Sequence, residues 1–246
     1  MKHTTKTRLD VLLLKRGLAE SREQAQRLIR AGVVLSGEKI LSKPGQMFPE
    51  DIPIEIKKQV KFVSRGGEKL EFALKTFNID LNDKVCLDVG ASTGGFTDCM
   101  LQYGARQVIA VDVGFGQLHW KLRTDKRVIV LEKVNARYLK PEHLPARPEF
   151  CAIDVSFISL TKIMPAVVNV LKKNSYLVTL VKPQFEAGPE HVERGGVVRD
   201  ENVRKSVVDS ITKFGTSTLN LKLVGIVESP LRGPAGNIEY LLCWEK

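Results

Sequence analysis

The feature that most constrains this fold is a regular alternation of short apolar runs with helix-like segments beyond residue 84. Each run is rich in aliphatic residues and short enough to be a buried strand, while the intervening segments are long enough for helices. Such an alternation predicts a parallel sheet with helices on both faces, an α/β fold. The five runs are residues 85–89, 108–113, 128–131, 150–155 and 177–181.

The end of the chain departs from this alternation. Residues 221–227 and 238–244 are two apolar runs that a loop rich in Pro and Gly joins, with no helix between them. Strands joined without a crossover helix pair antiparallel, so we expect the last strand to run against the others. Before the sheet, apolar residues at helical spacing predict an amphipathic helix over 70–77, entered through Gly66 and Gly67.

A smaller module precedes the alternating region, from residue 7 to about residue 58. Leucines at helical spacing predict a first helix, and Ser21 followed three residues later by Gln24 is a capping box that begins a second. Short β-like runs follow at 33–35 and 52–56, separated by turn residues. We therefore expect a compact α+β module with two helices and few strands.

The second helix of this module has two faces. At about 100° per residue its apolar residues fall on one side and its arginines on the other. An arginine face is either solvated or a binding surface for a polyanion. The formal net charge of +10 and the pI near 9.5 favour a polyanion, with RNA and an anionic membrane both possible on charge alone. The arginines that we expect to contact RNA phosphates in this module are Arg8, Arg22, Arg27 and Arg30.

Composition excludes several classes of protein. With 43% hydrophobic and 27% charged residues the chain has the composition of a soluble globular protein. No apolar stretch reaches the roughly 18 residues needed to span a bilayer, and residues 1–16 lack the features of a signal peptide. The four cysteines are far apart and form no CxxC pair, so neither disulfides nor a zinc site is indicated. We expect a cytoplasmic protein with no metal and no membrane insertion.

The first strand of the predicted sheet runs into a glycine-rich turn, DVGASTGGF. A strand, a glycine turn and a helix bring backbone amides close to a ligand, although a structural tight turn is the alternative. Asp112 ends the second strand, where an acid can accept hydrogen bonds from ribose hydroxyls. GASTGG lacks the GxGxxG order of dinucleotide sites, which favours S-adenosylmethionine as the cofactor.

Asn135 follows the third strand, where its amide could read the adenine edge or simply cap the next turn. The residues predicted to bind the cofactor are Asp88, Gly90, Ser92, Thr93, Gly94, Gly95, Phe96, Asp112 and Asn135.

Four charged residues are candidates for catalysis. Asp154 and Lys182 end the fourth and fifth strands inside apolar runs, and Glu239 begins the reversed last strand, so all three should meet at one edge of the sheet. Lys69 opens the preceding helix, and its position does not follow from the topology. A structural ion-pair network is the alternative. A ribose hydroxyl is a poor nucleophile, so its methylation requires a base, and lysine serves as one only when deprotonated.

The N-terminal string RLDVLLLKRGLAESREQAQRLIRAGVVLSGEKI, residues 8–40, resembles the RNA-binding domain shared by a small-subunit ribosomal protein, bacterial tyrosyl-tRNA synthetases and pseudouridine synthases. That resemblance implies RNA as a partner. The strings VSRGGEKL, CLDVGASTGGFTDC, AVDVGFGQLHWKLR, NAR, IDVSFISL, VKPQFEAG and GGVVRD occur in order between residues 62 and 200. They resemble the TlyA-type (hemolysin A) family of rRNA 2'-O-methyltransferases, which have an FtsJ-like methyltransferase domain.

The resemblance implies a Rossmann-like methyltransferase domain over 66–246, an RNA-binding domain over 1–59 and a linker over 60–65. It implies ribosomal RNA, or ribosomal subunits, as the partner and cytidine ribose as the target. The family's catalytic tetrad maps onto Lys69, Asp154, Lys182 and Glu239, with Lys182 as the base, and Arg65 is added to the RNA-binding set. The family's linker often carries a tryptophan, whereas this chain has VKFV at 60–63.

Two other functions compete with this interpretation. A membrane-active cytolysin is suggested only by the older family name, and the sequence shows neither a signal peptide nor a spanning segment. A non-catalytic RNA-binding factor could retain a methyltransferase fold without its chemistry. The intact set of four charged residues favours an enzyme. A base methyltransferase is disfavoured because DVSF replaces the Asn/Asp-Pro-Pro-aromatic motif expected of one.

Overall fold

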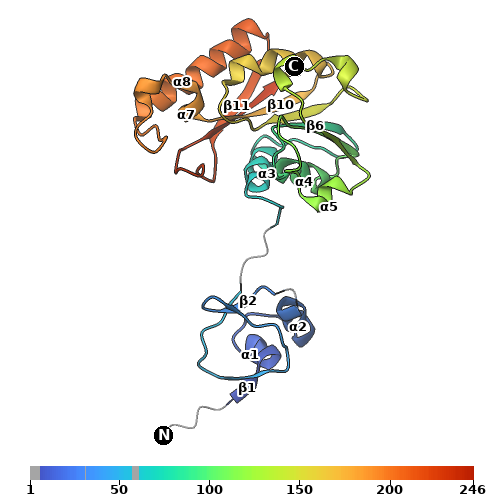
Figure 1. Ribbon diagram of the computed structural model, residues 1–246, viewed down its shortest axis with the longest axis vertical. Coiled ribbons are helices and arrows are strands. Elements are labelled where there is room, and N and C mark those ends of the chain that lie inside the picture. The colour runs from blue at the N-terminus through green and yellow to red at the C-terminus, as the bar shows by residue number, and fades with distance from the viewer. Residues whose placement is uncertain (1–5, 31, 57–60) are drawn as a thin grey trace. The chain divides into compact units, whose positions relative to one another are not determined.

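Figure 1 shows the computed structural model, which describes residues 6–30, 32–56 and 61–246. Residue 60, the first of the expected linker, and the last residues of the expected N-terminal domain lie outside the described residues. The contacts within the chain divide it into two compact units, with the boundary in the sequence between residues 60 and 61. Among the described residues, no helix is long and apolar enough to cross a membrane.

The smaller unit is an α+β module, as predicted. Leu9 and Leu13 of the first helix pack against Ala25 and Ile29 of the second, and Val34 completes this small core. The sequence did not predict the strands at Lys6–Arg8, Lys39–Ile40 and Met47–Pro49, because runs of two or three residues show no alternation of apolar and polar residues. The strands form two small sheets, β1–β4 and β3–β2–β5. The elements are β1 (Lys6–Arg8), α1 (Leu9–Lys15), α2 (Arg22–Arg30), β2 (Val34–Ser36), β3 (Lys39–Ile40), β4 (Met47–Pro49) and β5 (Glu55–Ile56).

Helix α2 has the two faces that the sequence predicted. Ala25 and Ile29 are buried, whereas the arginines at positions 22, 27 and 30 are exposed. The Oγ of Ser21 accepts a hydrogen bond from the Gln24 N–H at 3.1 Å, which confirms the cap. The Gln24 amide oxygen turns back one residue further than a standard capping box and accepts from the Glu20 N–H at 2.6 Å.

A buried carboxylate, Asp10, fixes the beginning of this module. Arg8 binds it through two hydrogen bonds of 3.0 Å, while Arg22 and Gln26 donate to it at 3.1 and 2.9 Å. The bonds from Arg8, and further ones from Gln26 and Arg22, hold the pKa of Asp10 well below its ordinary value against the effect of burial. Two arginines that we predicted as RNA contacts therefore use donor groups on the module's own fold.

The larger unit contains a seven-stranded sheet in the order β11-β12-β10-β9-β6-β7-β8. Strands β6 to β10 run parallel to one another, and β12 is antiparallel to both β10 and β11. The prediction of a reversed last strand is thus confirmed. The strands are β6 (Val85–Val89), β7 (Gln107–Val111), β8 (Val128–Leu131), β9 (Phe150–Ile153), β10 (Tyr176–Val181), β11 (Lys222–Glu228) and β12 (Tyr240–Glu245).

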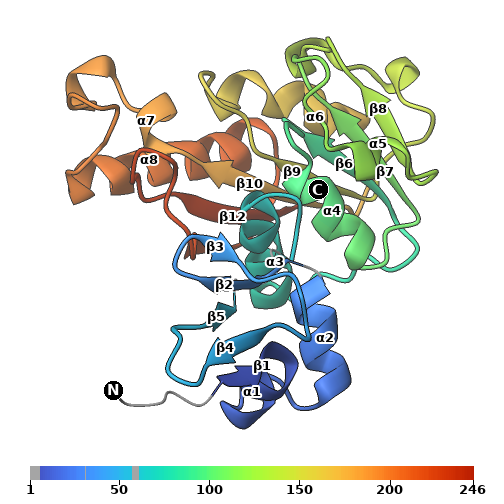
Figure 2. The same ribbon diagram turned by 60° about the horizontal axis from the view of Figure 1, so that its bottom comes forward.

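Helices cover both faces of this sheet (Figure 2). Leu87 of β6 belongs to one apolar cluster, with Met164 of α6 and Ile211 of α8, while its neighbour Cys86 belongs to another, with Leu70 of α3. Side chains alternate between faces, so a strand covered on both sides is apolar throughout. The helices are α3 (Gly66–Thr76), α4 (Gly95–Gln102), α5 (Trp120–Arg123), α6 (Met164–Val170), α7 (Pro183–Glu186) and α8 (Glu201–Lys213). Short 3₁₀ turns η1 (Ala136–Tyr138), η2 (Pro141–His143), η3 (Leu160–Lys162) and η4 (Pro189–His191), and a π-helical turn η5 (Phe214–Thr218), complete the unit.

The strand order reverses between β6 and β9, because β7 and β8 lie on one side of β6 and β9 and β10 on the other. Connections leave such a point in opposite directions and open a crevice beyond the carboxyl ends of the strands. The order of the strands therefore positions a binding crevice between the ends of β6 and β9.

The described part of the expected linker packs on the larger unit. Phe62 is 2% exposed and lies in the apolar cluster of α3, and the Val63 N–H donates to Asp98 of α4 at 2.9 Å. A side chain at Gly67 would come within 2.2 Å of the Phe62 ring, so this close approach requires glycine. Residues 61–65 therefore belong to the larger unit, and Phe62 and Val63 pack against its helices α3 and α4.

Candidate active site

Two cavities open at the carboxyl ends of the parallel strands. The first, of about 670 Å³, is lined by all four charged residues that the sequence proposed for catalysis. The second, of about 530 Å³, is lined by Asp112 and Asn135 from the ends of the second and third strands. The cavities adjoin each other, because the same residues line both: Gly90, Ser92, Asp154, Ser156 and Phe157.

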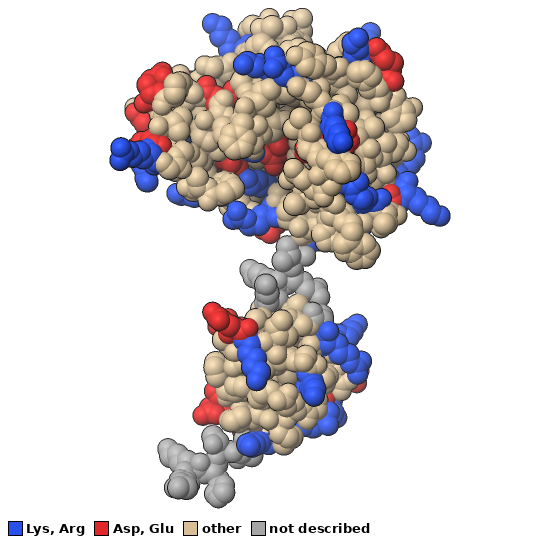
Figure 3. Space-filling view, viewed as in Figure 1, with Lys and Arg blue, Asp and Glu red and all other residues tan. Residues whose placement is uncertain are grey.

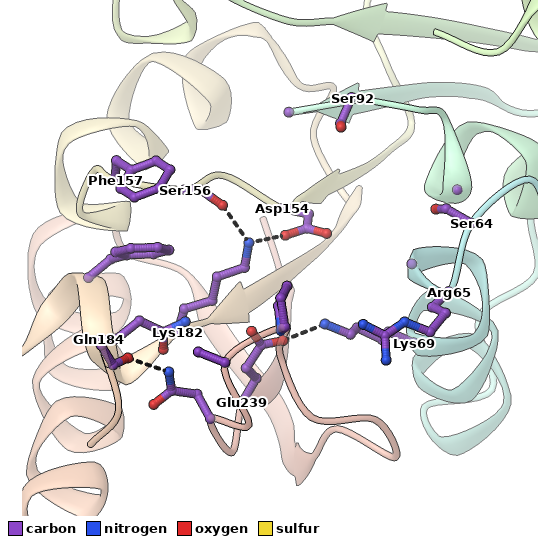
Figure 4. A pocket seen from close by; sticks show the side chains of 18 of the residues that line it. Ser64, Arg65, Lys69, Ser92, Asp154, Ser156, Phe157, Lys182, Gln184 and Glu239 are labelled. Atoms are coloured by element: carbon purple, nitrogen blue, oxygen red, sulfur yellow. Dashed lines mark hydrogen bonds and ion pairs between the residues drawn. The ribbon is translucent and has the colours of Figure 1, made fainter. Parts of the chain in front are cut away.

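One ion pair of the first cavity joins the ends of two neighbouring strands. Lys182 follows β10 and Asp154 follows β9, and the Lys182 Nζ lies 2.6 Å from the Asp154 Oδ1 (Figure 4). The amine also donates to the Ser156 Oγ at 3.0 Å. The Lys182 and Asp154 side chains are 12% and 22% exposed, so both remain accessible from the cavity.

A second ion pair lies deeper. Glu239 directly precedes β12 and reaches the common edge because that strand is reversed, as predicted. Its Oε2 lies 2.5 Å from the Nζ of Lys69 in α3, and the two side chains are 1% and 10% exposed. The Gly233 backbone closes over Glu239, since a side chain there would come within 2.5 Å of Oε1. Each of these two buried charges is stabilised by the other, so the loss of either side chain would leave an unpaired charge in the interior.

The glycine turn makes the crevice narrow. Gly90 has a φ of +85°, and a Cβ there would come within 2.4 Å of the Asp154 carbonyl oxygen, so only glycine fits. The predicted cofactor residues of this turn that line one or both cavities are Gly90, Ser92, Thr93, Gly95 and Phe96.

Asp88 and Gly94, which we also predicted to bind the cofactor, line neither of these two cavities. Gly94 is covered by Leu118 and Leu122, which a side chain at this position would strike. Asp88 is fully buried and accepts a hydrogen bond from the Thr97 Oγ1 at 2.6 Å. Burial raises the pKa of Asp88 to about 7. Asp88 and Gly94 therefore contact the protein interior, on the side of the glycine turn away from the two cavities.

The second cavity carries the residues predicted for the nucleoside. The Asp112 carboxylate accepts from the Ser92 N–H at 2.7 Å and the Gly114 N–H at 2.6 Å, which leaves each oxygen a further lone pair. The Asn135 Oδ1 accepts from the Arg137 N–H at 3.1 Å and caps η1. The capping interpretation therefore describes the Asn135 oxygen, while the residue also lines the cavity.

Several residues of the first cavity were missed in the sequence. Phe157 is 90% exposed with a φ of +62°, and its ring lies 4.9 Å from that of Phe185. Asn237 is buried, accepts from the Val198 N–H at 2.9 Å and donates to the Gly196 carbonyl at 2.7 Å. The unusual backbone of Phe157 and the long-range contacts of Asn237 leave no sequence signal, although exposed aromatics and strained residues are enriched at functional sites.

Arg65 lines the first cavity one residue before α3, so it belongs to the larger unit. Figure 3 shows that lysine and arginine side chains are distributed over the visible surfaces of both units and are not gathered in one patch.

Comparison with known proteins gives a family match for each unit. Residues 62–246 match the model of the FtsJ-like methyltransferase family, and residues 7–50 match the S4 domain. A Bacillus subtilis protein named "Putative rRNA methyltransferase YqxC" is 51% identical over 96% of this chain and 85% of its own. The Mycobacterium tuberculosis protein named 16S/23S rRNA (cytidine-2'-O)-methyltransferase TlyA is 44% identical over 96% of this chain and 89% of its own.

A solved structure, named "Putative hemolysin from Streptococcus thermophilus", is 45% identical, covers 99% of this chain and 89% of its own, and superposes with a TM-score of 0.75. The central sheet, the reversed last strand and the family match agree with one another. The chain belongs to the FtsJ-like methyltransferase family, within the TlyA-type group that carries an N-terminal S4 domain.

Proposed function

We propose that this protein methylates the 2'-hydroxyl of a cytidine in ribosomal RNA, with S-adenosylmethionine as the methyl donor. The observation that carries the proposal is the pairing of Lys182 with Asp154 in a cavity that adjoins the one lined by Asp112 and Asn135. The nature of the target nucleotide is supported by the name of the Mycobacterium tuberculosis relative. The S4 domain supports RNA as the partner.

The residues of the second cavity fit the cofactor. Asp112 offers carboxylate oxygens to a pair of ribose hydroxyls, and the Asn135 amide lies on the same side of the sheet. The glycine turn brings backbone close to the space that both cavities share. When bound there, S-adenosylmethionine supplies an activated methyl group. The protein therefore has to bind and orient the cofactor and the RNA and to remove the proton of the hydroxyl.

Lys182 is the residue that we assign to proton removal. Its amine is reachable from the first cavity, and Asp154 and Ser156 hold it in a fixed direction. To act as the base, the Lys182 ammonium that pairs with Asp154 first releases a proton to solvent, and the neutral amine then accepts the proton of the ribose hydroxyl. The deeper ion pair of Lys69 and Glu239 forms part of the wall of the same cavity as Lys182 and contributes two fixed charges to it.

The test uses ribosomal subunits from a strain that lacks this gene. Subunits are incubated with labelled S-adenosylmethionine and the protein, and the product is mapped by nuclease digestion and mass spectrometry. We expect one labelled 2'-O-methylcytidine. Lys182→Ala should give no label, whereas Lys173→Ala, an exposed lysine before the opposite end of β10, should act like the wild type. Label on a base, or none with the wild type, would overturn the proposal, and liposome leakage would favour a cytolysin.

A further inference from the structure

Two segments that follow neighbouring strands run side by side along the first cavity. One follows β9 and extends from Asp154 to Leu160, and the other follows β10 and extends from Lys182 to Glu186. Three contacts join them in order: Lys182 to Asp154 and Ser156, the ring of Phe185 to that of Phe157, and Glu186 to Ser159 and Leu160.

The last of these contacts is the most specific. The Glu186 Oε2 accepts from the Ser159 Oγ at 2.6 Å, and its Oε1 accepts from the Leu160 backbone N–H at 2.7 Å. Both carboxylate oxygens are therefore bound to one turn of the other segment. Ser159 is itself the cap of η3, since its Oγ accepts from the Thr161 N–H at 3.1 Å.

Glu186 lies outside the reacting groups. It lines neither of the two cavities described above, and a separate cavity of about 430 Å³ on the side of α8 borders it instead. Burial raises the pKa of Glu186 above its ordinary value, against the two hydrogen bonds that lower it. A partly desolvated acid with both oxygens committed has a function in holding the backbone and not in contacting a ligand.

From this arrangement we infer that Glu186 is a positioning residue, which holds the 154–160 segment against the 182–186 segment so that Asp154 keeps the Lys182 amine in place. The inference rests on the proposed function of Lys182. The unusual backbone of Phe157, with its positive φ, lies between the two ends of the held segment. Without the Glu186 hydrogen bonds, the polar and aromatic contacts between the two segments that the structure describes are those of Lys182 and Phe185.

The chain offers matched variants. Glu186→Ala removes both hydrogen bonds. Glu186→Gln keeps an oxygen for the Leu160 N–H, and its amide donates to the Ser159 Oγ, which can accept after rotation of its proton. Glu190→Ala removes the same charge from an exposed position, 67% exposed, that borders the same outer cavity. Ser159→Ala removes one of the two bonds and serves if Glu186→Ala does not fold.

Single-turnover methyl transfer to ribosomal subunits, at saturating cofactor, is the first measurement. We expect Glu186→Ala to slow the step by roughly 10- to 100-fold with cofactor affinity unchanged, because a small displacement of a reacting group costs this much. Glu186→Gln should recover most of the rate, and Glu190→Ala should equal the wild type. Wild-type rates for Glu186→Ala, or no recovery in Glu186→Gln, would overturn the inference.

A second measurement does not depend on activity. The rate at which an amine-reactive reagent labels Lys182, followed by peptide mass spectrometry, reports how firmly Asp154 and Ser156 hold the amine. We expect several-fold faster labelling of Lys182 in Glu186→Ala and unchanged labelling of Lys173. Equal labelling of Lys182 in both proteins would contradict the positioning role, even if the wild type failed to methylate RNA and the proposed function fell on its own.

Discussion

The two ion pairs of the first cavity have the same chemistry and different surroundings. Lys182 and Asp154 are 12% and 22% exposed, whereas Lys69 and Glu239 are 10% and 1% exposed. All four side chains line the cavity and the two lysines are similarly exposed, so the acids carry the difference: Asp154 is open to the cavity, whereas Gly233 closes over Glu239. Because the two pairs have the same kinds of residue, the exposure of the acid is the difference on which we propose proton transfer for Lys182 with Asp154 and a structural role for Lys69 with Glu239.

The largest effect should follow from changing the accessible pair. Lys182→Ala should retain cofactor and RNA binding and slow single-turnover methyl transfer by about 100- to 10,000-fold, the usual contribution of a general base. Lys182→Arg should recover little, since guanidinium keeps its proton. Near-normal rates for Lys182→Arg would make the lysine an electrostatic residue and remove the distinction between the pairs.

The buried pair should instead control stability. Glu239→Ala leaves the Lys69 charge buried without a partner, and we expect a loss of about 3–5 kcal/mol in the free energy of unfolding. The double variant Lys69→Met with Glu239→Leu should recover most of that stability without recovering activity. Urea unfolding measures both. A loss below roughly 1 kcal/mol for Glu239→Ala would place this pair in the solvent-screened class.

A smaller effect should follow from a residue outside both pairs. Asp112→Ala should weaken S-adenosylmethionine binding by roughly 10- to 100-fold, the weight of hydrogen bonds to a charged group, and leave RNA affinity nearly unchanged. Calorimetry and filter binding separate the two affinities. Asp112 also accepts from two backbone amides, one on each oxygen, so Asp112→Asn keeps only one of these bonds and Asp112→Ala keeps neither. Thermal unfolding of both variants checks the local turn. Equal losses of both affinities would indicate misfolding.

The smallest effect concerns the S4 unit, which repeats the contrast between paired and available charges. Arg8 and Arg22 bind Asp10, whereas Arg27 and Arg30 are exposed and form no ion pair with any residue that the structure describes. Replacing Arg27 and Arg30 by alanine should reduce the slope of log affinity for RNA against log salt concentration. The expected reduction is roughly 0.7 to 0.9 for each RNA phosphate that an arginine no longer neutralises.

Arg8→Ala is the comparison for that experiment. It should lower the thermal stability of the S4 unit more than it changes the salt dependence, because the buried Asp10 loses its bidentate partner. An unchanged salt dependence in the Arg27 and Arg30 variant would exclude this helix face from the RNA interface.

The features that could be predicted from the sequence are those that depend on local periodicity and strand polarity. Apolar runs fixed the five parallel strands, and a helix-free connection fixed the reversal of β12. These two facts place Asp154, Lys182 and Glu239 at one edge, because parallel strands end where an antiparallel strand begins. Their meeting was therefore predictable from the order of residues alone.

Which charges are paired, buried or accessible depends on contacts between segments that are far apart in the chain. The partner of Lys69, the withdrawal of Asp88 behind the glycine turn and the Glu186 hydrogen bonds each depend on how separate segments pack together. Packing sets such contacts to within tenths of an ångström, and no periodic pattern records them. Desolvation depends on this packing. A pair of a lysine and an acid is therefore accessible at one place in the cavity, Lys182 with Asp154, and buried at another, Lys69 with Glu239.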